Sequence, residues 1–272
     1  MKMTRIITLS IASLFAVQIA NADTSGTSSK SITDVMNMSY YSAFEGPALS
    51  KFNTKQGTDD GTDGSSPIDF YNILSVGVKN SPIAKFQADF RFYYVPTENK
   101  GEPLRLADPR ISWAIKNVVS GGGFTLRQIK IRNDLPLSKG AAKNKLESTP
   151  SLLLTAGYEL PVKGLSLGLD TYTKGYTYGE GGGEKIQFLN GIYPSIAYEI
   201  NDEFSVDATY ANEMAVFNSK PGFNTISSYF MPRFNWTLSK NLTVSPSVLI
   251  HVLNGPKMNA TQAYLELSGA IL

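Results

Sequence analysis

Residues 223–253 read FNTISSYFMPRFNWTLSKNLTVSPSVLIHVL, and this stretch decides the fold. In its first half, apolar residues such as Phe234 and Trp236 alternate with polar ones such as Arg233. Successive side chains of a β-strand point to opposite faces, so this alternation predicts one apolar and one polar face. The polar residues 239–241 then separate the strand from a second alternating run. The stretch therefore predicts a long antiparallel hairpin.

The apolar face of this hairpin needs a cover. In a soluble protein a second layer of helices or strands would bury it, and the rest of the sequence offers no amphipathic helix or apolar layer for that purpose. In a bilayer, lipid covers the apolar face while the polar face lines the interior of a closed barrel. We therefore expect an all-β fold: a closed, antiparallel, up-and-down transmembrane β-barrel.

Residues 1–22 have the features of a secretory signal peptide. Lys2 and Arg5 precede an apolar core at 6–20, and the triplet that ends at Ala22 is a cleavage site of the A-x-A type. The core is shorter than the ~20 residues that a membrane-spanning helix needs, which favours a cleaved signal over an N-terminal anchor. We expect export and cleavage after Ala22.

Composition excludes several classes of function. Without Lys2 and Arg5, the 25 basic residues fall to 23 and match the 23 acidic ones, so the mature chain is formally neutral and lacks the basic excess of a nucleic-acid-binding protein. The absence of cysteine excludes disulfides, thiolate chemistry and cysteine-based metal sites. No apolar run of 18 residues follows the signal, which excludes a helical inner-membrane protein.

A barrel of about twelve strands is expected within residues 35–272, after a flexible Ser/Thr/Gly-rich lead at 23–34. The predicted strands are 35–45, 68–78, 83–95, 108–119, 124–135, 150–160, 164–176, 185–200, 204–216, 223–238, 242–253 and 260–272. Connections after odd-numbered strands are longer, and those after even-numbered strands span three or four residues. An even strand number and this asymmetry between the two ends are typical of outer-membrane barrels.

In this strand pattern the chain resembles the bacterial outer-membrane β-barrel proteins, and the resemblance covers nearly all of the mature chain. It implies a location in the bacterial outer membrane, with short periplasmic turns and longer extracellular loops. It also implies two partners, the outer-membrane lipid and the machinery that inserts such barrels.

The charged residues of the polar face are the candidate functional residues, because this face would line the lumen. Basic residues gather on the third to fifth predicted strands and acidic residues on the sixth to ninth, so two walls of opposite charge would face each other. The candidate lumen-lining residues are Lys85, Asp89, Arg91, Arg110, Lys116, Lys130, Arg132, Glu159, Asp170, Glu199, Asp207, Glu213, Arg233, His251 and Glu266.

These walls favour a narrow, porin-like channel for small polar or anionic solutes. Twelve strands lie between the eight that side chains fill and the sixteen that enclose a water channel. Two alternatives therefore stay open: a structural or adhesive barrel whose lumen is plugged by salt bridges and, more remotely, an outer-membrane lipid hydrolase.

No enzymatic activity and no cofactor are expected. The single histidine, His251, lies on the polar face, and Ser247 on the same strand is roughly 13 Å away, too far to act as its nucleophile. The Asp-rich segment 57–67 lacks the spacing and the closing glutamate of an EF-hand. No helix signal follows the glycines at 121–123, which argues against a phosphate-binding loop.

Overall fold

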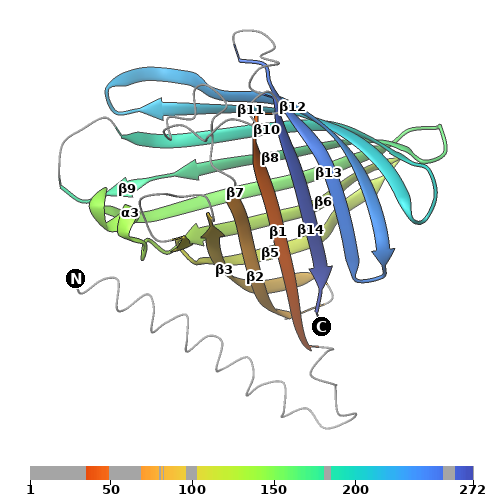
Figure 1. Ribbon diagram of the computed structural model, residues 1–272, viewed down its shortest axis with the longest axis horizontal. Helices are drawn as coiled ribbons and strands as arrows, with labels where there is room; N and C mark the ends of the chain where they lie inside the picture. Colours follow the sequence, from red (N-terminus) through yellow and green to blue (C-terminus); the bar gives the residue numbers. More distant parts are fainter. Residues whose placement is uncertain are drawn as a thin grey trace.

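The computed structural model shows a closed β-barrel (Figure 1). It describes residues 35–48, 69–79, 81, 83–95, 103–180, 185–253 and 261–271. The predicted signal peptide at 1–22, the lead at 23–34 and the Asp-rich segment 57–67 lie outside these ranges. No helix in the described ranges combines the length and the apolar composition needed to span a membrane.

Twelve strands make up the wall. They are β1 (Met36–Ala48), β2 (Asp69–Lys79), β3 (Ala84–Tyr94), β5 (Arg110–Gly121), β6 (Phe124–Asp134), β7 (Leu146–Glu159), β8 (Leu165–Gly175), β10 (Ile186–Glu199), β11 (Phe204–Phe217), β12 (Lys220–Ser239), β13 (Leu242–His251) and β14 (Gln262–Ala270). Two short strands extend the ladder beyond them: β4 (Leu104–Leu106) pairs with β3, and β9 (Thr177–Tyr178) pairs with β7. The predicted number of wall strands is confirmed.

Pairing between the first and last strands closes the ring. β1 pairs antiparallel with β2 on one side and with β14 on the other, and the β2–β3 pairing completes the circuit. Every other wall strand pairs antiparallel with its neighbours in the chain. The prediction of an up-and-down antiparallel barrel is therefore confirmed.

Two predicted loops differ from the structure. The connection expected at 217–222 is a two-residue turn, because β12 begins at Lys220, which pairs with Phe217. Gly222, at φ +88°, gives the backbone the freedom to bend within this extension. In the loop expected at 136–149, Ser138 caps the short helix α3 (Lys139–Lys143), and β7 already begins at Leu146.

The two faces of the wall differ in chemistry and exposure. On β3, the outward Phe90 is 55% exposed, whereas the inward Asp89 next to it is 3% exposed. Outward aromatic rings also pack together near both ends of the barrel. Phe44 and Phe70 are 5.3 Å apart by ring centroid at the end with long loops, and Phe204 packs on Phe234 and Trp236 at 5.6 and 6.1 Å toward the end with short turns. Such rows are typical of the aromatic girdles of membrane barrels.

Replacing Phe90 by Arg tests the facing of these strands. An arginine on the lipid-facing surface near mid-membrane is expected to lower the free energy of unfolding by ~2–4 kcal/mol. In the Thr209→Arg variant the new side chain points into the lumen beside Asp207. The free energy of unfolding should then change by less than ~1 kcal/mol. Guanidinium chloride titration of the barrel in phospholipid vesicles measures both values, and equal losses would contradict the assigned facing.

Candidate functional site

The inward face of the strands surrounds a lumen in which side chains converge. Lys174 on β8, for example, contacts Asp134 on β6 across the intervening strand β7. A contact between strands two apart is natural on the concave side of a wall, whereas side chains diverge on the convex side. All fifteen candidate lumen residues lie within the twelve wall strands at inward positions of the register.

The largest charged group surrounds Asp134, which the candidate set did not include. Its carboxylate lies 2.6 Å from Lys174 Nζ, 2.9 Å from Arg110 Nε and 3.5 Å from an Arg91 guanidinium nitrogen. Only 6% of the Asp134 side chain is exposed. The intervening residue on β7 is the small Ser151, which pairs directly with Lys174 and leaves room for the lysine to cross. One carboxylate thus joins cations from three strands.

Asp89 extends this group toward β2. It accepts hydrogen bonds from Ser75 Oγ at 2.7 Å and Gln87 Nε2 at 2.5 Å, and it lies 3.7 Å from Arg110. Arg110 therefore bridges the two buried carboxylates, Asp89 and Asp134. A buried charge needs such partners to offset the loss of its hydration.

A second group centres on Arg233. Its Nη1 lies 2.6 Å from Glu266 on β14, and its Nε lies 3.6 Å from Asp207 on β11. Tyr41 donates to Glu266 at 2.6 Å, and Asn235 donates to Asp207 at 2.7 Å. This group connects β1 and β14 to β11 and β12.

The ion pairs of the described residues follow the wall. Each joins neighbouring strands or strands two apart, as in Arg233 with Asp207 and Lys174 with Asp134. In this part of the chain, none reaches from β3 or β5 to the opposite strands β11 and β12. The predicted basic and acidic walls therefore do not meet in the middle of the lumen through these residues.

Four cations form a basic track on the inner side of β3, β5 and β6: Arg132, Lys130, Lys85 and Lys116. Lys85 and Lys130 flank the small, 2%-exposed Ala114 in the register. No carboxylate of the described residues lies within 4 Å of any of the four. The Nε of Arg132 is buried and has no hydrogen-bond partner among the described residues.

The acidic residues of the candidate set lie on β7, β8, β10 and β11, and β7 pairs directly with β6, so the acidic wall begins beside the basic track and reaches the opposite side of the barrel at β11. Asp170 accepts from Thr155 at 2.6 Å, and Asp207 is held by the Arg233 group. Glu159 and Glu199 are exposed near the end with short turns. No cation of the described residues lies within 4 Å of either glutamate.

His251 lies near the end with long loops. Its Nε2 is 3.0 Å from Gln262 Oε1, and Gln262 donates to Glu45 at 3.0 Å. Its hydrogen bond in the described structure is therefore to an amide and not to a serine. Glu45 lies outside the candidate set, although the alternation of residues 35–45 puts it on the polar face.

Besides Asp134, Lys174 and Glu45, several tyrosines of the lumen are absent from the candidate set. Tyr172 and Tyr193 donate to Glu213 at 3.0 and 2.5 Å, and their rings stack with centroids 5.9 Å apart. Gly191 makes room for them, since a Cβ there would lie 2.4 Å from the Tyr172 ring. Alternation alone already puts Tyr172 on the polar face, so this signal was available in the sequence.

Comparisons with known proteins find similarity in the fold and none in the sequence. The chain matches no family model and no curated protein by sequence. In structure it is similar to an outer membrane channel from Pseudomonas putida F1, with a TM-score of 0.58, 10% identity, and coverage of 87% of this chain and 96% of that one. The KdgM and NanC porins also align, with TM-scores of 0.48 and 0.47, 8% identity each, and coverage of 87% and 85% of this chain and 99% and 97% of theirs.

The closed twelve-stranded ring, with its apolar outer face and charged inner face, has the fold of the outer-membrane β-barrel proteins. The expected resemblance to that class is confirmed at the level of the fold.

Asp134→Asn tests the largest charged group. Removing this charge leaves three cations close together without their shared partner, so the free energy of unfolding should fall by about 3 kcal/mol. Asp170→Asn is the matched control, because Asp170 bonds to the Thr155 hydroxyl, and it should cost less than ~1.5 kcal/mol. Unfolding titrations in vesicles measure both, and a smaller loss for Asp134→Asn than for Asp170→Asn would contradict the role of the group.

Proposed function

We propose that this protein is a bacterial outer-membrane channel that passes small polar or anionic solutes through a charge-lined lumen. The observation that carries the proposal is the direction of the ion pairs. In the described part of the chain they run along the wall, so they stiffen the barrel without bridging its lumen.

The separated charges supply a means of selection. The basic track carries four positive charges with no described carboxylate within 4 Å, and Asp170, Glu159 and Glu199 lie on strands beyond it. Charged residues that line a pore attract solutes of opposite sign and set its selectivity. The negatively charged group of a solute would move along the basic track. A positively charged group on the same solute would move along the acidic wall.

The outer face supports the membrane location. Apolar side chains such as Phe90, Phe234 and Trp236 are 39–55% exposed on it, and only hydrocarbon would cover them without a second protein layer. With the end that carries long loops outside the cell, the short turns face the periplasm. The lipid of the outer membrane and the barrel-insertion machinery are the partners that follow from this location.

A structural barrel without conductance is the second candidate. The close-set ion pairs and hydrogen bonds around Asp134 and Arg233 favour it. Such networks would equally suit a wall built for stability. An enzymatic role has less support, because His251 bonds to Gln262, and we propose that the protein is not an enzyme.

Conductance in planar bilayers tests the channel. The wild-type barrel should give single-channel steps, and Arg132→Ala should lower the chloride-to-potassium permeability ratio by roughly twofold to fivefold, the equivalent of about 0.5–1 kcal/mol for one charge in a wet pore. The ratio is read from the reversal potential in a KCl gradient.

Lys240→Ala removes the same charge in the β12–β13 turn, away from the basic track, and should leave the ratio unchanged. Absence of steps from correctly folded wild-type barrel would refute the channel and favour the structural alternative. An equal effect of both variants would refute the basic track as the selective element.

Export can be tested separately. After expression in a Gram-negative host, we expect the protein in the outer-membrane fraction with Asp23 as its first residue, as read by mass spectrometry of the intact chain. Recovery as a soluble periplasmic protein, or with residues 1–22 retained, would contradict the proposed location or the cleavage site.

A further inference from the structure

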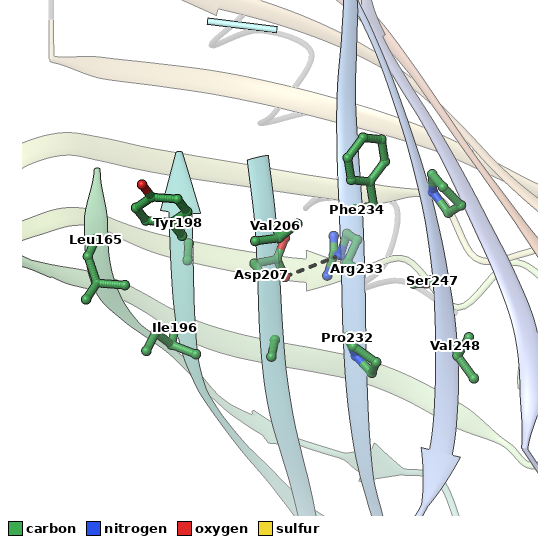
Figure 2. A pocket seen from close by; sticks show the side chains of 13 residues that line it. Leu165, Ile196, Tyr198, Val206, Asp207, Pro232, Arg233, Phe234, Ser247 and Val248 are labelled. Carbon is green, nitrogen blue, oxygen red and sulfur yellow. Dashed lines mark ion pairs between the residues drawn. The ribbon is translucent and has the colours of Figure 1, made fainter. Parts of the chain in front are cut away.

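An apolar groove crosses the outer face of the barrel over β8 to β13 (Figure 2). Its volume is about 710 Å³. Side chains of Ile196, Val206 and Phe234, which are 38–45% exposed, form part of its lining. Inward-facing Arg233 and Asp207 also contribute to the lining, and the two form an ion pair with each other.

The strand register explains why a groove forms here. Ala208 on β11 lies beside Pro232 on β12, and along β12 this pair of small residues lies between Phe230 and Phe234. Outward residues on one strand are two positions apart, or roughly 6.6 Å. A pair of small side chains beside larger ones leaves a depression in the outer face, and Ile196 on β10 and Val248 on β13 continue its lining on either side.

The groove also lies over an interruption in the β12–β13 ladder. Over residues 231–235 of β12, the single ladder pair with β13 is Arg233–Ser247. Pro232 and Pro246 lie next to that pair, and proline has no N–H to donate. The β11–β12 and β13–β14 ladders are continuous at the same level, so both missing donors belong to the β12–β13 seam.

We propose that this groove binds the acyl chain of a membrane phospholipid. The proposal rests on the membrane location argued above, because the groove is continuous with the apolar outer face that hydrocarbon would cover. Strands of such barrels tilt by ~35–45°, so a groove across them runs obliquely through the bilayer and can hold a chain along its length.

Shape, and not transfer from water, provides the affinity. An acyl chain is already in hydrocarbon when it meets the barrel, so binding gains come from van der Waals packing. The convex wall elsewhere touches a chain from one side, whereas the groove touches it from the floor at Ala208 and Pro232 and from the flanking row at Val206 and Phe234. A bound chain would also shield the proline-interrupted seam.

Ala208→Phe fills the floor of the groove and tests the proposal. Ala88→Phe is the matched control, because Ala88 is an outward alanine on β3, away from β8–β13. Barrels reconstituted in vesicles of phosphatidylethanolamine and phosphatidylglycerol are extracted in a mild non-ionic detergent, and bound phospholipid is counted by native mass spectrometry. Wild type and Ala88→Phe should retain one phospholipid, and Ala208→Phe about tenfold less.

Wild-type barrel without retained phospholipid, or Ala208→Phe with wild-type retention, would overturn the site. Val248→Phe, which narrows the groove from β13, gives the same test if Ala208→Phe does not fold. Ala208 points away from the lumen, so its variant should keep wild-type conductance. Loss of lipid with normal conductance therefore supports the groove, whereas a non-conducting wild-type barrel that retains lipid refutes the channel alone.

Discussion

The pairing of β1 with β14 is the constraint on which the rest of the structure depends. A strand edge in hydrocarbon would leave a row of backbone N–H and C=O groups without partners, at several kcal/mol for each group. In a ring, every wall strand has a neighbour on both sides. Closure also creates the two environments of the molecule, since it turns one face of every strand outward and the other inward.

Closure explains why the inner wall is so strongly networked. Side chains that project inward converge, so a carboxylate such as Asp134 can contact cations from β3, β5 and β8 at once. These networks offset the cost of partly burying charge in the wall. They also leave the basic track without described carboxylates within 4 Å, which is the asymmetry on which the proposed selectivity rests.

Alternation was enough to predict the fold, because a period of two assigns each residue to a face without any knowledge of its neighbours. It placed all twelve wall strands, with boundaries that mostly differ by a few residues. It failed at Lys220, where the Lys-Pro-Gly sequence has the composition of a loop but continues the strand. The sequence gives no local sign there that Lys220 will pair with Phe217.

The contacts of the lumen were beyond the same reasoning. Alternation gives the face of a residue but not its level along the barrel, and that level depends on turn lengths and bulges around the ring. The contact between Lys174 and Asp134, 40 positions apart, follows from the registers of β6, β7 and β8 together. The lumen tyrosines were missed for a different reason: charge was the only signal used, although Tyr172 and Tyr193 hold Glu213 in place.

The central claim, a two-sided strand with hydrocarbon on one side and water on the other, can be tested along β12. The chain has no cysteine, so single substitutions to cysteine give unique thiols that can be probed in vesicles with a charged, membrane-impermeant maleimide. The account predicts that cysteines at Tyr229, Asn235 and Thr237 react and that those at Phe230, Phe234 and Trp236 do not. Uniform labelling, or labelling of the second set alone, would contradict it.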